Sequence, residues 1–120
     1  MRRMNDVLPL LPKISFVVRV RDEQDAAASV CARLCELADD LGEAAEVLFV
    51  DDGSRDETAR RIGARMAYDT RVRLLELSRP FGVEASLAAG MDFATGRAVV
   101  CLQAGAPGVL EAVRQLVHRW

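Results

Sequence analysis

Short apolar runs alternate four times with longer segments of helical periodicity, and this alternation constrains the fold more than any other feature of the sequence. The runs are rich in Val, Ile, Leu and Phe, and they predict strands over 14–20, 46–51, 72–77 and 98–102. Because the strand–helix connections are short, we expect a parallel sheet with right-handed crossovers. The sequence therefore predicts an α/β domain of three layers, with helices on both faces of the sheet.

The helical segments carry start and stop signals. The first spans 24–41 and ends at Gly42. The second begins with Ser54-Arg55-Asp56-Glu57, a capping-box pattern, and its expected buried stripe is Ala59, Ile62 and Met66. The third is expected over 82–94. The last begins at Pro107, and its apolar face consists of Val109, Leu110, Val113, Leu116, Val117 and Trp120.

The last two predicted strands differ in pattern. Arg71, Arg73 and Glu76 alternate with apolar residues in the third, which favours an edge position. The fourth, 98–102, is apolar on both faces, which is typical of an interior strand. We expect no later segment to cover its outer edge, and an uncovered apolar edge favours pairing. We therefore expect a truncated domain: either it continues beyond Trp120, or self-association or a partner chain covers strand 98–102.

Composition excludes several classes of protein. The net charge of −2 gives no basic field for nucleic acid. No apolar run approaches the roughly 20 residues of a membrane span, so no transmembrane segment is expected. Residues 1–12 are too short and too proline-interrupted for a signal peptide, and we interpret them as a flexible leader before a domain over 13–120.

Three cysteines, Cys31, Cys35 and Cys101, are too few for a disulfide framework. Cys31 and Cys35 share a helical face, but no second Cys or His pair completes a metal site. We interpret these residues as buried thiols of a reduced, cytoplasmic protein, whose membrane contact would be peripheral or through a partner.

The residues that carry chemical information follow the second predicted strand. Asp51 and Asp52 lie at its carboxyl end, where parallel sheets bind ligands, and Gly53 and Ser54 follow. A carboxylate there can accept hydrogen bonds from a ring N–H or a sugar hydroxyl. The alternative is a turn that leads into a helix cap, because caps use the same residue types.

Further segments accompany this motif in a fixed order: 14–18, Asp22-Glu23, 50–58, 77–79, 81–82, 84–85, 88–90 and 96–100. In that order they resemble the amino-terminal part of family-2 glycosyltransferases, most of all the polyprenol-phosphate sugar transferases. The resemblance implies the nucleotide-diphospho-sugar transferase fold of glycosyltransferase A type, with strand order 3-2-1-4. It also implies a UDP- or GDP-linked sugar donor and a lipid-phosphate or saccharide acceptor.

By the same resemblance, Asp52 would hold the nucleotide base, Asp51 would support the turn, and Val20 and Glu23 would line the pocket. The complete predicted site is Val20, Asp22, Glu23, Asp51, Asp52, Gly53 and Ser54.

The resemblance breaks at the metal motif. Family members carry Asp-x-Asp after the fourth strand, and it holds Mg²⁺ or Mn²⁺ on the donor diphosphate. The equivalent positions here read Gln103-Ala104-Gly105-Ala106, and no acidic residue lies between Asp92 and Glu111. One amide oxygen is a poor ligand set for either ion, so we predict no metal ligand and leave the cofactor unknown.

Two other departures concern binding and catalysis. Where the family has Pro-x-Tyr-Asn-Glu, this sequence has 19–23, Arg-Val-Arg-Asp-Glu. Arg21 could stack on a base, or Arg19 and Arg21 could pair with Asp22 or Asp51. The family's catalytic base and acceptor site lie beyond the position of Trp120, so no catalytic residue is predicted and enzymatic activity is left open.

Three functions stay open from sequence. The chain could be a glycosyltransferase-like protein that binds a nucleotide-sugar donor. It could instead be a catalytically inactive, truncated relative that acts as a binding or assembly partner, or a gene product without retained activity.

Overall fold

The computed structural model describes residues 12–119. Apart from Pro12, the predicted flexible leader over 1–12 lies outside the described residues, and so does Trp120. No helix in the described part of the chain is long and apolar enough to cross a membrane.

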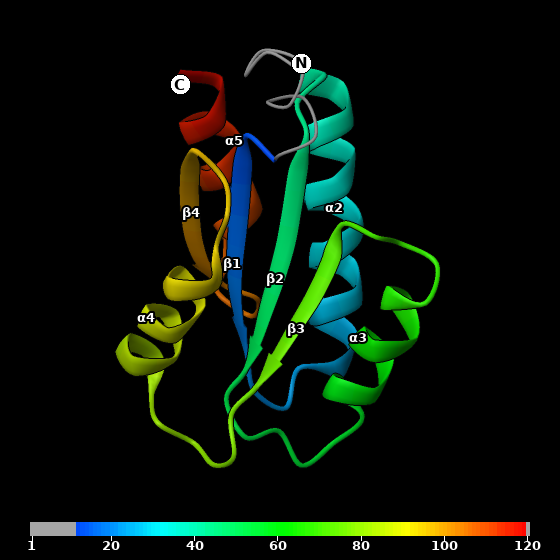
Figure 1. Ribbon diagram of the computed structural model, residues 1–120, viewed down its shortest axis with the longest axis vertical. Helices are drawn as coiled ribbons and strands as arrows, with labels where there is room; N and C mark the ends of the chain where they lie inside the picture. The colour runs from blue at the N-terminus through cyan, green and yellow to red at the C-terminus, as the bar shows by residue number, and fades with distance from the viewer. Residues whose placement is uncertain (1–11, 120) are drawn as a thin grey trace, which may run out of the picture.

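Four parallel strands form one sheet in the order β3-β2-β1-β4, as predicted. The strands are β1 (Ile14–Val20), β2 (Ala45–Asp51), β3 (Val72–Glu76) and β4 (Ala98–Gln103). The helices are α2 (Gln24–Leu41), α3 (Thr58–Met66), α4 (Val83–Phe93) and α5 (Val109–Arg119). Helix α4 covers one face of the sheet, and α2, α3 and α5 cover the other (Figure 1). The three-layer prediction is therefore confirmed.

The two central strands form the core. All seven residues of β2 and six of the seven in β1 are buried, because helices cover both faces. Phe16 and Phe49 pack with Leu34 of α2 on the three-helix face. Cys31 and Cys35 are buried in the same cluster, which confirms that part of the cysteine interpretation, but Cys101 is exposed.

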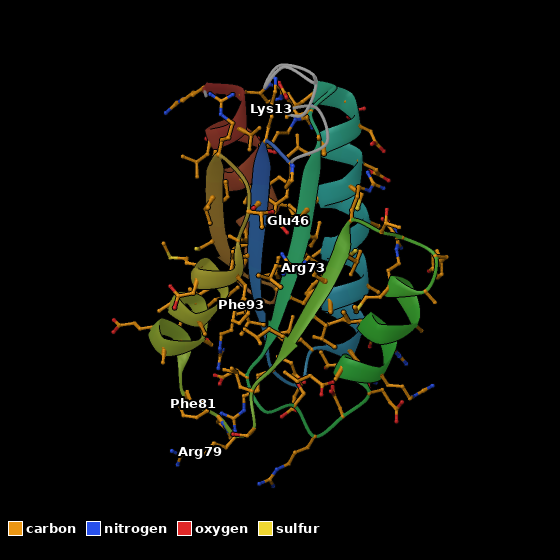
Figure 2. All side chains as sticks on the ribbon, viewed as in Figure 1. Lys13, Glu46, Arg73, Arg79, Phe81 and Phe93 are labelled. Carbon is orange, nitrogen blue, oxygen red and sulfur yellow. The ribbon has the colours of Figure 1, made fainter. Side chains whose placement is uncertain are left out.

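A buried carboxylate fastens the loop after α4 to the sheet. Glu46 of β2 accepts hydrogen bonds from Ser15 Oγ (2.5 Å), the Thr95 amide (2.7 Å) and Arg73 Nη1 (2.7 Å). Figure 2 shows Glu46 and Arg73 together on the α4 face, and Arg73 also donates to the Phe93 carbonyl at the end of the helix. This network fixes where β4 begins.

Helix α3 differs from its prediction. It begins at Thr58, and Ser54 does not cap it, because the Ser54 hydroxyl accepts a hydrogen bond from the Asp22 amide in another loop. The Asp56 carboxylate instead accepts from the Thr58 amide at 2.9 Å. Ile62 is buried as expected, whereas Met66 is 40% exposed because it lies at the end of the helix.

Strand β4 lies at the edge of the sheet, as the strand order 3-2-1-4 implies, although its apolar pattern alone is typical of an interior strand. Within the described residues it is an edge strand, paired with β1 on one side only. Its side chains alternate in burial: Leu102 lies in the core, but Val99 and Cys101 are exposed. The apolar sequence of β4 predicted that both of its faces would be buried. Among the described residues only one face is buried, by the core around Leu102.

Candidate functional site

The predicted site residues come together where β1, β2 and β3 end. Loops at the carboxyl ends of these strands gather at the lower end of the molecule in Figure 1, away from the start of β1 and the end of α5. In open parallel sheets this is the edge at which ligands bind. Short hydrogen bonds connect the loops that follow β1, β2 and β3.

Asp52 is the most deeply placed of these residues, with no exposed surface. Its Oδ1 accepts from the Phe81 amide at 2.7 Å, and its Oδ2 accepts from the Gly82 amide at 3.1 Å. Arg19 adds two hydrogen bonds to Oδ2, from Nη2 at 2.8 Å and Nε at 3.1 Å. Burial raises the pKa of Asp52, but these donors outweigh it and lower the pKa below its ordinary value. The carboxylate is therefore ionised and tightly held.

The partner of Arg19 corrects the sequence interpretation. Its guanidinium pairs with Asp52, not with Asp22 or Asp51. The Arg19 side chain is 13% exposed, so the ion pair is largely removed from water. Four carboxylates, those of Asp22, Glu23, Asp51 and Asp52, lie at or just after the ends of the two strands, and only the three-dimensional arrangement selects among them.

Asp51 and Gly53 shape the turn after β2. Asp51 Oδ1 accepts a hydrogen bond from the Ser54 amide at 3.0 Å, which closes the turn. Gly53 has φ of 80°, a left-handed conformation that glycine adopts without strain. A Cβ atom there would lie 2.8 Å from the ring of Pro80, so the loop after β3 packs directly on this glycine.

Asp22 joins the loop after β1 to the loop after β2. Its Oδ1 accepts hydrogen bonds from the Arg55 amide at 2.7 Å and the Asp56 amide at 3.3 Å. Its own amide donates to Ser54 Oγ at 2.9 Å. Asp22 adopts φ of 50°, unusual for a residue with a side chain, and these three hydrogen bonds stabilise it there.

Glu23 carries an acceptor that is not used within the described residues. Its amide donates to Thr58 Oγ1, and its Oε1 accepts from the Arg21 amide. Oε2 is buried and has no hydrogen-bond partner in the described part of the chain. It lies against Gly105, so closely that a side chain at that position would collide with it. Glu23 thus meets the segment in which the family's metal motif would lie.

Val20 is the predicted site residue whose side chain does not face the loops. It is fully buried in the core, and only its carbonyl takes part, accepting from the Asp52 amide at 2.9 Å. The other six, Asp22, Glu23, Asp51, Asp52, Gly53 and Ser54, are brought together. Whether any of the seven contacts a nucleotide stays a prediction.

Two residues of this region were not predicted as site residues. Phe81 donates its amide to Asp52, but its ring is 47% exposed. The Arg79 guanidinium lies 4.8 Å from the centre of that ring, and Figure 2 shows the pair beyond the carboxyl ends of the strands. The only sequence signal was that both residues fall within the segments 77–79 and 81–82 of the family resemblance.

Comparison with known proteins decides the family. The family model described as glycosyl transferase family 2 matches residues 15–104, which include all of the four strands except Ile14 and every residue of the predicted site. The chain belongs to this family.

Two curated relatives and one solved structure illustrate the match. An uncharacterized glycosyltransferase of Bacillus subtilis, YkcC, is 34% identical over 106 residues, covering 88% of this chain and 33% of the relative. A prophage bactoprenol glucosyl transferase homolog of Escherichia coli is 33% identical, covering 90% and 35%. A mannosyltransferase of Pyrobaculum calidifontis, solved with GDP-Man and Mn²⁺, superposes with a TM-score of 0.67 at 24% identity, covering 88% and 32%. The chain thus spans about one third of the length of the family members it matches.

The family's metal ion does not fit the residues that this chain offers. Gln103 ends β4 and Gly105 follows, so neither motif position carries a carboxylate. Among residues 12–119, no group of three or more His, Cys, Asp or Glu side chains is placed to hold a metal ion. The carboxylate of Glu23 lies against Gly105, and a single acidic side chain is too few ligands for Mg²⁺ or Mn²⁺. We therefore derive no chemical step through a metal in this chain.

Proposed function

We propose that this chain binds the nucleotide of a UDP- or GDP-linked sugar donor at the carboxyl ends of β1 and β2. The observation that supports this most is the convergence of two loops from separate strands. Asp22, Glu23, Ser54 and Thr58 hold these loops together, and Asp51 and Asp52 lie beside them. A site fixed by so many contacts is preorganised, which lowers the entropic cost of binding.

The chemistry of the loops suits a nucleoside diphosphate. Glu23 Oε2 has no hydrogen-bond partner among residues 12–119, and it can accept from a base N–H or a ribose hydroxyl when the segment at Gly105 moves away from it. The exposed arginines Arg21, Arg55 and Arg79 lie on the surrounding loops, and none of them forms an ion pair within residues 12–119. Their charges can neutralise a diphosphate where carboxylates for a metal ion are missing. We accordingly expect binding that does not require a divalent cation.

We propose the acceptor and the cellular location of the protein from its relatives. A relative named as a bactoprenol glucosyl transferase suggests a lipid-phosphate acceptor, and a saccharide is the alternative. A lipid-phosphate acceptor would bring a cytoplasmic protein to the membrane surface as a peripheral one. We assign the chain donor binding, and no described residue is assigned the catalytic step.

Isothermal titration calorimetry with UDP and with GDP tests the proposal. We expect saturable binding of one nucleotide, unchanged between Mg²⁺ and EDTA. Glu23→Gln should weaken it about tenfold or more, because the free carboxylate acceptor is lost. Arg33→Ala, on the exposed side of α2, is the matched control and should bind as the wild type does. No saturable heat with either nucleotide would contradict the proposal.

A second candidate is a binding or assembly role, which the outer edge of β4, unpaired within residues 12–119, favours. Val99 is 38% exposed and Leu116 of α5 is 59% exposed, and between them lies an apolar groove of about 320 Å³. Pairing of two β4 strands would satisfy both edges and bury this groove. Sedimentation velocity should then detect a dimer that Val99→Lys dissociates and Glu84→Lys does not. A wild-type monomer at high concentration would exclude self-association.

A further inference from the structure

The ion pair between Arg19 and Asp52 lies within the proposed nucleotide site and affects its availability. We propose that Arg19 is an internal competitor for the nucleotide: its guanidinium occupies the acceptor positions of Asp52 that a base N–H would otherwise use. Arg19 then sets the affinity of the site. This inference rests on the proposed function, because it concerns the same ligand and the same loops.

The carboxylate of Asp52 is filled by donors from its own chain. Four hydrogen bonds reach its two oxygens, and three of them converge on Oδ2: those from the Gly82 amide and from Nε and Nη2 of Arg19. A carboxylate offers about four lone-pair positions. One lone-pair position on Oδ1 is left, but Asp52 has no exposed surface, so a ligand N–H can reach the carboxylate only when one of the present donors moves away.

Arg19 is the donor that can leave. The amides of Phe81 and Gly82 belong to the backbone of a loop that packs on Gly53 through Pro80. Arg19 is a long side chain near the end of β1, and it keeps 13% of its surface exposed. When it swings out, the two amides still hold one hydrogen bond on each oxygen of Asp52. The carboxylate stays ionised and gains free acceptor positions on Oδ2.

The ligand class follows from those positions. An ionised carboxylate that has free acceptor positions pairs with a ring N–H, such as the imide of uracil or the N1–H of guanine. A released guanidinium pairs with phosphate oxygens. A nucleoside diphosphate carries both a ring N–H and phosphate oxygens. It can therefore separate the ion pair, with its base bound to Asp52 and its phosphates bound to Arg19. Only the molecules in which Arg19 has left Asp52 can bind the ligand. The apparent affinity is therefore the intrinsic affinity multiplied by the fraction of such molecules.

Titration calorimetry of a small set of variants with UDP and GDP tests this inference. Arg19→Met keeps the length of the side chain and removes its charge and donors, and we expect at least tenfold tighter binding than wild type. Arg19→Lys keeps the charge but cannot form the bidentate contact, so it should give an intermediate gain. Arg33→Met, the same change on the exposed side of α2, should leave the affinity unchanged. Thermal melts establish the temperature at which all variants are folded, and Arg19→Lys carries the test if Arg19→Met does not fold.

The double variant Arg19→Met/Asp52→Asn separates competition from general loosening of the loops. If the freed carboxylate is the acceptor, the double variant loses the gain; a gain that persists would overturn the inference. Equal or weaker binding by Arg19→Met than by a binding-competent wild type overturns the inference and leaves the proposed function standing. If Arg19→Met binds a nucleotide and the wild type shows no binding, the inference is supported and donor binding by the unmodified chain is overturned. If no protein in the set binds a nucleotide, both the inference and the proposed function are overturned.

Discussion

At the scale of single residues, Glu46 shows how a buried charge stabilises the fold. It is 5% exposed, and its carboxylate joins β1, β3 and the loop after α4. Burial raises its pKa, but the hydrogen bonds from Ser15, Thr95 and Arg73 outweigh that effect and lower the pKa from 4.5 to about 2. The network therefore favours the ionised form in the folded protein.

Removal of this carboxylate should destabilise the protein strongly. Glu46→Ala leaves the Ser15 hydroxyl and the Thr95 amide without their acceptor, whereas Arg73 is 40% exposed and keeps the Phe93 carbonyl, so we expect a loss of about 1–3 kcal/mol in the free energy of unfolding. Urea denaturation at pH 7 measures it. Glu36→Ala, on the exposed side of α2, should change the free energy by less than about 0.5 kcal/mol. Equal effects of the two substitutions would show that the network contributes nothing.

The same residue predicts a dependence of stability on pH. Because the folded pKa of Glu46 is lowered, its contribution is fully present above the unfolded value of 4.5 and is lost as the pH falls towards about 2. The free-energy difference between wild type and Glu46→Gln should therefore shrink between pH 4.5 and pH 2. Denaturation curves of both proteins across that range measure it, and a difference independent of pH would contradict the assignment.

At the scale of elements, α4 packs closely against the sheet. Gly90 allows the helix to approach β1 and β2, because a Cβ atom there would lie 2.7 Å from Val50 Cγ2 and still nearer to Val17. Gly63 of α3 is the natural comparison, since nothing lies within 4 Å of its Cβ position. One glycine is required by packing, and the other is not.

Matched substitutions separate the two glycines. Gly90→Ala should lower the free energy of unfolding by about 1–3 kcal/mol, because the added methyl overpacks the interface. Gly63→Ala should raise it by about 0.5–1 kcal/mol, because alanine is the better helix former. Thermal and urea denaturation measure both, and a stabilising Gly90→Ala would show that α4 packs less closely than described.

Local patterns in the sequence predicted the elements well but not their non-local contacts. The four strands followed from apolar runs and short connections, which are properties of neighbouring residues, whereas their order was implied by the family resemblance. Ser54 was misjudged as a helix cap because its hydrogen-bond partner, Asp22, lies in a different loop. The pairing of Arg19 with Asp52 was missed for the same reason. The apolar sequence of β4 likewise does not reveal whether another segment buries its side chains.

At the scale of the whole molecule, the described residues contain one part of the proposed donor site, and an acidic metal motif is not among them. Its loops bring together six of the seven predicted residues, with Glu23 Oε2 unused and Asp52 occupied by Arg19. The segment after β4 offers Gln103 and Gly105 in place of acidic ligands. Nucleotide binding is therefore the activity that these residues support, and turnover is not assigned to them.

Nuclear magnetic resonance tests nucleotide binding at this position most directly. Spectra of the ¹⁵N-labelled chain, titrated with UDP or GDP in EDTA, should show saturable amide shifts concentrated in 19–23, 51–55 and 79–82. Amides of α5 and of the outer edge of β4 should stay unchanged. Shifts confined to other parts of the chain, or none with either nucleotide, would contradict the proposed donor site.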